Sequence, residues 1–404
     1  MRSLTTVHVA LAAAIALLVL AGWPAPTAHA APVHTSTPGP TPGKVRFVKR
    51  TNTAFDRFTD RPSPALAEWF RSHYWRMVVF SPYFDARSAW YPGGWSYRDL
   101  YWIPRKPRMS RRERRWILRD RRGRPLYVPS TCHPGYCSHY AGDFTNKSFR
   151  RHWIRSARAE LRRARYAGLW LDDVNMELRT ANAAGREVRP VDRRTKRWMS
   201  YARWRKSVAA FVVEIRRALP GVEIVHNSIW FGGHRVGRDS DRYVRRQIRA
   251  ADYINVERGV NDAGLTGGSG EWSVNALLAY IDRVHAAGKP VVLDSAAVGE
   301  AEREYGLASY FLIDTGRDGI GNSVGGNPDD WWSGYDVTLG APTSGRYVWE
   351  GLLRRDFERG VVLLNEPSAP ERTVVLGQAL IDLRGVPRPV VTLGPARGAV
   401  LRRP

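Results

Sequence analysis

The segment GLWLDDVN, residues 168–175, places a short apolar run directly before two consecutive carboxylates. Residues 169–171 predict a buried strand, because a continuous apolar run of this length is typical of the inside of a parallel sheet. A helix precedes this strand, since apolar residues recur at helical spacing from Phe149 to Ala164 and stop before Gly168. A helix that leads directly into a buried strand is the repeating unit of α/β proteins.

The same alternation extends in both directions from this segment. Further helices are predicted at residues 64–73, 204–219, 241–250 and 273–287, and strands at 45–48, 75–80, 116–118, 169–171, 222–225, 253–256, 291–293 and 309–313. Eight such units over roughly 270 residues suit a closed, parallel (β/α)8 TIM barrel of the α/β class. An open doubly wound sheet is the alternative, but no glycine-rich phosphate turn follows the first strand.

The two ends of the chain differ from this pattern. Residues 1–30 have the positive start, apolar run and small-residue cleavage site of a signal peptide, and residues 31–43 form a Pro/Thr-rich linker. The barrel is expected over residues 44–342. Short strand-like runs without helices in residues 343–404 predict a small C-terminal antiparallel β-sandwich domain. We therefore expect a secreted protein, extracellular or associated with the cell wall, with no membrane contact after signal cleavage; a retained N-terminal anchor is the alternative.

The composition is strongly basic. The 404 residues include 63 Lys and Arg against 38 Asp and Glu, which gives a formal net charge of +25. Such a charge attracts polyanions, but a biased genome composition produces the same excess of arginine, and the sequence favours neither explanation. Because no P-loop or zinc-finger spacing is present, we expect no nucleic-acid partner and no cofactor.

The two cysteines, Cys132 and Cys137, lie five positions apart. In an exported protein such a pair is expected to form a disulfide that closes a short loop. His133 and His139 flank the pair, so a metal site is the alternative. A zinc site usually needs four well-spaced ligands, or three and a water, so the disulfide is the stronger expectation and no metal is predicted.

Carboxylates follow two of the predicted strands. Asp172 and Asp173 come directly after residues 169–171, and Glu257 follows residues 253–256. Active sites of TIM barrels lie at the carboxyl ends of the strands, and glycoside hydrolysis needs two carboxyl groups beside the scissile bond. These strands are the fourth and sixth of the barrel, so Asp172 or Asp173 would face Glu257 across its rim. Turn formation and helix capping are the structural alternatives for each residue alone.

The remaining candidates are expected to bind the sugar. Asn227, Asp294 and Asp314 follow other predicted strands and could orient hydroxyl groups. Aromatic rings suit the apolar face of a sugar ring, while carboxylates and arginine suit its hydroxyls. On these grounds the further binding residues are Tyr83, Asp85, Arg87 and Trp90 after the second strand and Trp331 and Trp332 after the eighth. Packing against the C-terminal domain is an equal alternative for the last two.

Several segments together resemble a known group of proteins. GLWLDDVN, the strand end NVERGV, SPYFDAR, GDFTNKSFRRHWI and the C-terminal RDFERGVVLLNEPS are similar to hypothetical glycoside hydrolases of the α-galactosidase-like TIM-barrel superfamily, distant relatives of endo-α-1,4-polygalactosaminidases. The resemblance implies a nucleophilic Asp on the fourth strand and a proton-donating acid on the sixth, here Asp172 and Glu257. The doubled Asp and the basic charge depart from that pattern, so Asp173 stays open as the nucleophile.

The sequence therefore predicts a secreted glycoside hydrolase that cleaves O-glycosidic bonds of an oligo- or polysaccharide by a two-carboxylate, retaining mechanism. The expected partner is a carbohydrate, and the charge suggests an anionic cell-wall or extracellular polysaccharide. Two other functions fit less well. One is a non-catalytic wall-binding protein on a hydrolase barrel, and the other is a phosphodiesterase acting on a polyanion, which would need a metal cluster that the scattered histidines do not suggest.

Overall fold

The computed structural model describes residues 42–50, 61–80, 90–164, 166–228, 241–323 and 331–404. The expected signal peptide and nearly all of the expected linker lie outside these residues. Among the helices that are described, none has the length and apolar character needed to cross a membrane.

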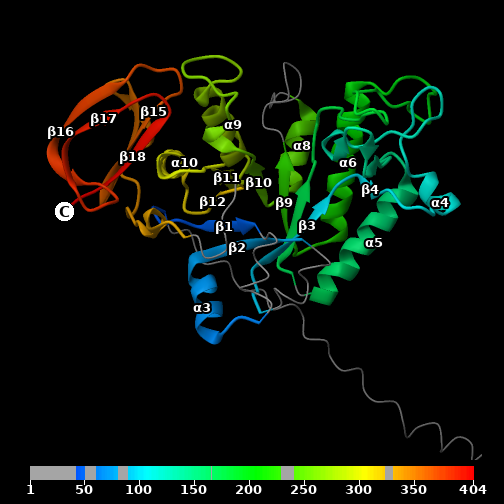
Figure 1. Cartoon of the computed structure of the whole chain (residues 1–404), viewed down its shortest axis with the longest axis horizontal. Helices are drawn as coiled ribbons and strands as arrows, with labels where there is room; N and C mark the ends of the chain where they lie inside the picture. The colour runs from blue at the N-terminus through cyan, green and yellow to red at the C-terminus, as the bar shows by residue number, and fades with distance from the viewer. Residues whose placement is uncertain (1–41, 51–60, 81–89, 165, 229–240, 324–330) are drawn as a thin grey trace, which may run out of the picture. The chain divides into compact units, whose positions relative to one another are not determined.

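Eight parallel strands close into a barrel, as predicted (Figure 1). Around the barrel the order is β1, β12, β11, β10, β9, β8, β3 and β2, which returns to β1. Their bounds are β1 Phe47–Arg50, β2 Tyr74–Val79, β3 Gly94–Asp99, β8 Gly168–Asp172, β9 Glu223–Ser228, β10 Tyr253–Val256, β11 Val291–Asp294 and β12 Gly319–Gly321. Strand β8, which lies within GLWLDDVN, is the fourth in chain order, and β10, which precedes Glu257, is the sixth.

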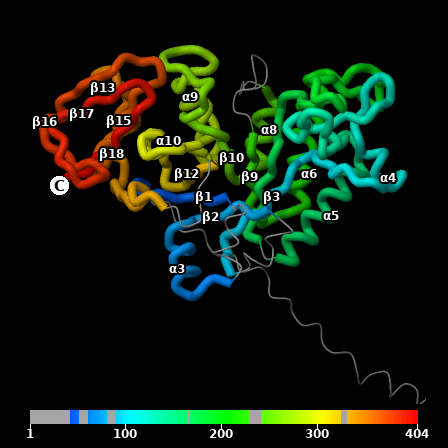
Figure 2. The backbone as a smooth tube through the Cα atoms, viewed as in Figure 1, coloured from blue at the N-terminus to red at the C-terminus, as the bar shows by residue number. Residues whose placement is uncertain are grey.

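Helices cover the outside of the barrel (Figure 2). They are α3 Pro64–His73, α5 Lys147–Ala164, α6 Tyr201–Ala218, α8 Arg242–Ala250, α9 Val274–Ala286 and α10 Glu300–Ile313, with the single turn α4 Arg111–Arg114 in the long β3–α5 connection. Ser63, Ser200, Asp241 and Ser273 each cap a helix by accepting a hydrogen bond from a backbone N–H of the first turn. These caps fix where the helices begin and hence the connections at the carboxyl ends of the strands.

Two of the eight predicted strands are wrong. Residues 116–118 lie in the β3–α5 connection, where Ile117 forms only an isolated bridge with Gly142, and the third barrel strand is β3. Residues 309–313 belong to α10, which is buried on nearly every side between the barrel and the C-terminal sheet. Its apolar run therefore lacks helical periodicity and resembles a strand.

The true eighth strand gave no signal because it is made of glycine and isoleucine alone. A side chain at Gly319 would meet the ring of Trp75 at 3.2 Å and Val48 at 3.4 Å. The glycines of β12 thus make room for large side chains contributed by the first two strands, at the expense of β-propensity.

The barrel interior is filled below its carboxyl rim. Trp95, Trp170, Val225, Tyr253 and Val292 pack together there with Val48 and Val78. Beneath them Glu223 accepts hydrogen bonds from Arg76 at 2.8 and 3.0 Å and from the indole of Trp95 at 2.7 Å. Because side chains alternate along a strand, the next inward-facing residue of each strand lies at the open rim.

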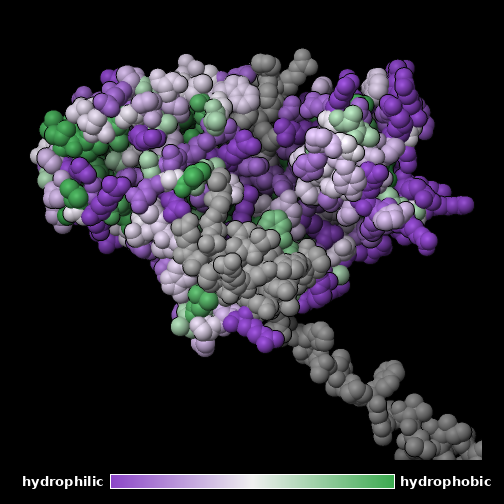
Figure 3. Space-filling model, in the orientation of Figure 1, coloured by the Kyte–Doolittle hydropathy of each residue, from purple (hydrophilic) through white to green (hydrophobic). Residues whose placement is uncertain are grey.

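The C-terminal part forms a six-stranded antiparallel sheet with its own core, as predicted for the C-terminal domain. The strand order is β13, β14, β15, β18, β16 and β17. Their bounds are β13 Tyr347–Trp349, β14 Leu352–Phe357, β15 Gly360–Asn365, β16 Arg372–Ile381, β17 Pro387–Leu393 and β18 Arg397–Arg402. Strand β18 packs on α10 so closely that a Cβ at Gly398 would lie 2.7 Å from that of Ala308. Val375 and Val390 stay exposed, and Figure 3 shows hydrophobic surface over β16 and β17.

Candidate active site

The carboxyl rim of the barrel brings Asp172 and Glu257 together through a single amide group. Asn227 Nδ2 donates to Asp172 Oδ1 at 2.7 Å and to Glu257 Oε2 at 3.2 Å. The two carboxylate oxygens are therefore within about 6 Å of each other, the sum of these two distances. Asn255 Nδ2 donates at 2.7 Å to Asn227 Oδ1, which fixes the amide of Asn227 with its nitrogen toward both carboxylates. The three strands β8, β9 and β10 are adjacent: Asp172 ends β8, Asn227 lies on β9, and Asn255 and Glu257 lie on β10 and directly after it.

Tyr97 completes the hydrogen bonding of Asp172. Its hydroxyl donates to Asp172 Oδ2, while Asn227 occupies Oδ1. Burial, followed by the negative charge of Asp172, raises the pKa of Tyr97, so the phenol stays protonated and remains a donor. These two donors, one on each carboxylate oxygen, hold the side chain of Asp172 in one orientation.

Tyr97 was missed because the third strand was placed at 116–118. The segment GWSYRD, residues 94–99, carries a signal for this strand. Trp95, Tyr97 and Asp99 alternate with Ser96 and Arg98, which is the period of a strand. All three face the barrel interior or its rim.

Asp173 turns away from the barrel interior. Its backbone has φ 53°, in the left-handed region, so the strand ends at Asp172 and the next side chain leaves the rim. Asp173 Oδ2 accepts from the indole of Trp102 at 2.8 Å, and Oδ1 accepts from Asn175 Nδ2 at 2.7 Å. Its backbone N–H donates to Asp172 Oδ1 at 2.7 Å. The geometry thus separates the two adjacent carboxylates into a rim residue and a supporting residue.

A third carboxyl, Asp99, lies beside Asp173. Asp99 Oδ1 accepts from the backbone N–H groups of Tyr101 at 2.8 Å and Trp102 at 2.7 Å. Its other oxygen receives no donor and lies next to the carboxyl of Asp173. Complete burial, followed by the charges of Asp173 and Asp172, raises the pKa of Asp99 well above its usual range. A raised pKa favours the neutral form of Asp99 beside the carboxyl of Asp173.

Asp294, on β11 beside β10, and Arg50, at the end of β1, extend the set of charged residues at the rim. Asp294 Oδ1 accepts from the backbone N–H of Ser323 at 2.8 Å, and Oδ2 accepts from that of Arg258 at 3.3 Å. Arg50 Nη2 lies 3.9 Å from Asp294 Oδ2, and the guanidinium is 5.1 Å from the ring centre of Trp170. The prediction placed Asp294 at a strand end correctly but ended the first strand at residue 48, so Arg50 was overlooked.

Asp314 is not at the rim. Residues 309–313 are helical, so Asp314 caps the C-terminus of α10 and does not end a strand. Its carboxylate accepts from the backbone N–H groups of Gly43 at 2.9 Å and Gly316 at 2.7 Å, which precede β1 and β12. Burial raises the pKa of Asp314 to about 6. The residue belongs to the amino-terminal end of the barrel, opposite the candidate site.

The predicted aromatic binding residues also lie elsewhere. Trp331 packs on Phe47 at 5.4 Å and Tyr74 at 5.6 Å, the first residues of β1 and β2, and Trp90 packs on Phe70 of α3 at 5.6 Å. All three contacts are on the amino-terminal side of these strands or beside α3. Tyr83, Asp85 and Arg87 lie outside the described residues.

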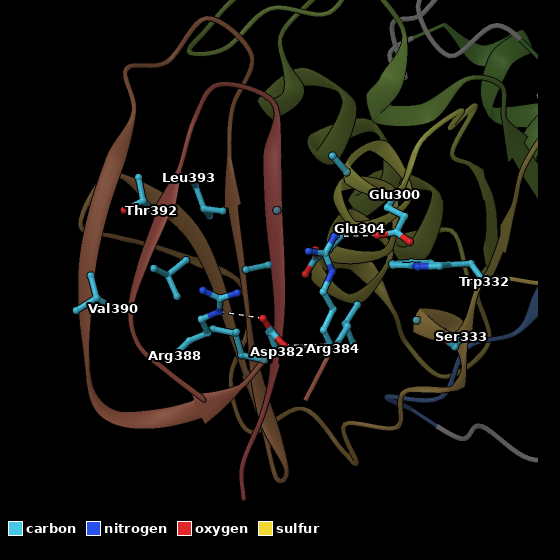
Figure 4. A pocket seen from close by; sticks show the side chains of 17 residues that line it. Glu300, Glu304, Trp332, Ser333, Asp382, Arg384, Arg388, Val390, Thr392 and Leu393 are labelled. Atoms are coloured by element: carbon cyan, nitrogen blue, oxygen red, sulfur yellow. Dashed lines mark hydrogen bonds and ion pairs between the residues drawn. The ribbon is translucent and has the colours of Figure 1, made fainter. Parts of the chain in front are cut away.

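Trp332 lines a separate pocket of about 430 Å³ between α10 and the C-terminal sheet. Figure 4 shows its ring beside Glu300 and Glu304, with Arg384 and Arg388 reaching in from the sheet. Arg384 pairs with Glu300 at 2.8 Å across this seam. The alternative reading of Trp332, packing at the C-terminal domain, fits this position.

The predicted disulfide is present. Cys132 and Cys137 are bonded and face each other across the hairpin formed by β5 Cys132–His133 and β6 Tyr136–Cys137. Within the described ranges, no group of three or more His, Cys, Asp or Glu side chains is arranged to hold a metal ion.

Comparison with known proteins gives one family match. The family described as hypothetical glycosyl hydrolase family 15 matches residues 73–361, which include every barrel strand except β1. No curated protein sequence matches the chain.

Solved structures of glycoside hydrolases are similar in fold. The maltogenic alpha-amylase AmyB of Thermotoga neapolitana has a TM-score of 0.52 and 9% identity, over 88% of this chain and 98% of that one. The glycoside hydrolase domain of PelA from Pseudomonas aeruginosa has a TM-score of 0.42 and 17% identity, over 70% and 95% of the two chains. At these identities the similarity concerns the fold alone.

Proposed function

Because the chain belongs to hypothetical glycosyl hydrolase family 15 and is a glycoside hydrolase, we propose that Asp172 and Glu257 cleave the O-glycosidic bond of its carbohydrate substrate. Asp172 is the nucleophile and Glu257 is the general acid. The observation that carries this assignment is the amide of Asn227, which donates to both carboxylates at the rim. Asp173 is left as a supporting residue, since its side chain is bonded to Trp102 and Asn175.

The proposed reaction has two steps with balanced proton transfers. In the first, an Asp172 oxygen attacks the anomeric carbon while Glu257 gives its proton to the departing glycosidic oxygen, which leaves an ester between Asp172 and the sugar. In the second, Glu257 takes a proton from water, and the water oxygen displaces Asp172. The enzyme returns to its starting protonation state, and the anomeric configuration is retained.

The spacing of the carboxylates supports retention over inversion. Retaining enzymes hold their carboxyl groups about 5–5.5 Å apart, whereas inverting enzymes need about 6.5–9.5 Å so that a water fits between nucleophile and substrate. Here the two oxygens bonded to Asn227 are within about 6 Å of each other. Tyr97 and Asn227 would also stabilise the carboxylate of Asp172 as it leaves the sugar in the second step.

We further propose that the enzyme is secreted and acts on an extracellular glycan, an inference supported by the signal-like residues 1–30. The net charge of +25 would concentrate anionic polymers near the protein. At the rim itself Asp172, Glu257 and Asp294 outnumber the nearby Arg50, so attraction of a polyanion must come from other surfaces.

The test is a screen of aryl glycosides and wall polysaccharides with the wild type, Asp172→Asn, Glu257→Gln and the control Glu68→Gln on the exposed face of α3. We expect activity in the wild type and control only. For a substrate that is cleaved, NMR of the first product identifies its anomer, and an inverted product would refute the double displacement. A wild type that binds glycans but cleaves none would support the non-catalytic alternative.

A further inference from the structure

A cationic groove lies between α6 and α8 on the outside of the barrel. It has a volume of about 620 Å³ and is lined by Lys206, Val213, Arg216, Arg217, Arg242, Tyr243, Arg246, Arg249 and Ala250. Six of these nine residues are cationic, and both helices contribute.

Helical periodicity explains why the charges gather on one side. In α8, Val244, Gln247 and Ile248 face the barrel and are buried, so Arg242, Arg246 and Arg249 fall on the outer face. In α6 the positions 206, 213 and 217 form the matching row along the groove. Cations of both helices, with Val213 between those of α6, thus line the same concave surface.

Most of the cations in the groove have no carboxylate partner among the described residues. Arg216 forms an ion pair with Asp252 and donates to the carbonyl oxygens of Ala250 at 3.2 Å and Val222 at 2.9 Å, so its guanidinium is fixed at the base. In contrast, no ion pair to a carboxylate within the described part of the chain involves the other five, Lys206, Arg217, Arg242, Arg246 and Arg249. Clustered like charges repel one another, and a bound anion would offset that repulsion.

The position of the groove relates it to the candidate active site. Helix α6 connects β8 to β9, and α8 connects β9 to β10. These three strands carry Asp172, Asn227 and Glu257 at their carboxyl ends. Arg242 lies in the first turn of α8 and Lys206 in the second turn of α6, toward the rim, while Arg217 and Arg249 lie in the last turns. The groove therefore runs along the barrel wall from the rim toward the amino-terminal end.

We infer that this groove binds a linear anionic glycan, whose repeating carboxylate or phosphodiester groups pair with the cations of both helices. Among the lining residues that the structure describes, Tyr243 is the sole aromatic one, and proteins that hold nucleic-acid bases usually stack them on several aromatic rings. The connection to hydrolysis rests on the proposed function, because a polymer held here would be tethered beside the rim. The binding itself does not depend on catalysis.

The experiment compares full-length wild type with two triple variants of equal charge change. The groove variant carries Arg217→Gln, Arg246→Gln and Arg249→Gln. The control carries Arg111→Gln, Arg114→Gln and Arg115→Gln in exposed positions of α4 and its C-cap. Glutamine is a good helix former, so neither change should disturb the helices. Binding to polygalacturonate, poly(glycerol phosphate) and duplex DNA is measured at low and physiological salt.

The inference expects the groove variant to bind polygalacturonate or poly(glycerol phosphate) about tenfold or more weakly than the wild type, with a shallower dependence on salt. The control should stay within about twofold of the wild type. The polymer that shows the larger loss identifies carboxylate or phosphate as the recognised group.

Three results would overturn the inference: equal losses in both variants, no binding of either polymer by the wild type, or groove-dependent binding that is tightest for DNA. Asp172→Asn should bind as the wild type does. A failure of the proposed hydrolysis would then leave the binding result intact, and a failure of binding would leave the hydrolysis assay intact.

Discussion

The buried carboxyl group of Asp99 lies beside that of Asp173, and burial raises the pKa of Asp99 well above its usual range. Trp102 joins the same two residues, since its backbone N–H donates to Asp99 at 2.7 Å and its indole to Asp173 at 2.8 Å. With Asp172 adjacent, three carboxyl groups lie within one hydrogen-bonded cluster. The raised pKa of Asp99 favours its neutral form, which limits the negative charge of that cluster.

Replacing Asp99 by asparagine should change how stability depends on pH. A raised pKa means that the contribution of Asp99 is fully present below its unfolded pKa near 3.9 and is lost as the pH rises toward the folded value. Asp99→Asn keeps a neutral donor toward Asp173 and removes that loss. Relative to the wild type, the variant should gain up to about 1.4 kcal/mol per pH unit across this range in urea unfolding. Parallel curves for the two proteins would show that Asp99 is ionised in the folded state.

The two adjacent aspartates should differ in kinetic effect. Asp172→Asn should lower kcat by about a thousandfold or more, because it removes the nucleophile while leaving the core intact. Asp173→Asn should lower activity less, because its role is to hold the strand end and Asp99. The measurement is kcat and KM on the best substrate of the screen. Equal losses would assign Asp173 a direct role, and near-normal rates in both would place the nucleophile on another strand.

Tyr97→Phe should reduce kcat/KM by about 10- to 100-fold, since one donor to the charged Asp172 is lost. A matched control exists in the C-terminal domain, where the hydroxyl of Tyr347 donates to Asp356 at 2.6 Å. Tyr347→Phe removes the same kind of bond far from the rim and should leave kcat/KM unchanged. If both variants lose activity equally, the effect of Tyr97 is on folding.

His226 should make the fold sensitive to acid. It lies on β9 and is buried beside α8, where Gln247 Nε2 lies 2.9 Å from its Nδ1. Burial lowers the pKa of His226 to about 3. The stability that depends on its neutral form is fully present above its unfolded pKa near 6.5 and is lost as the pH falls toward 3, by up to about 1.4 kcal/mol per unit. His226→Gln should flatten this slope between pH 6 and 4, whereas the exposed His133→Gln should not. An unchanged slope in His226→Gln would place the acid sensitivity elsewhere.

The fold was predictable where burial and periodicity agree. Leu169 to Leu171 are apolar, and Tyr253 to Val256 are apolar except for Asn255, because these segments are covered on both faces, so the strands that precede Asp172 and Glu257 were found. Strand β12 was not found, because two of its three residues are glycines that make room for Trp75 and glycine gives no strand signal. The helical run 309–313 was mistaken for a strand because α10 is buried all round.

The candidate site was predictable only in part. Carboxylates after apolar strands marked Asp172, Glu257 and Asp294, but which of two adjacent side chains faces the rim depends on the backbone conformation of Asp173. Tyr97 and Asp99 lie on a strand with polar inward positions, which has no apolar run to reveal it. Hydrogen bonds such as those of Asn227 join three strands that are far apart in sequence, and a local pattern carries no information about them.

The filled interior of the barrel closes the candidate site on the side that faces the amino-terminal ends of the strands. Trp95, Trp170 and the Arg76–Glu223 pair close the floor beneath Asp172. The departing fragment must then leave on the rim side, and the incoming water must approach from the same side. An alcohol that reaches the rim before water competes with water for the sugar bound to Asp172. The relative access of water and alcohols therefore decides between hydrolysis and transglycosylation.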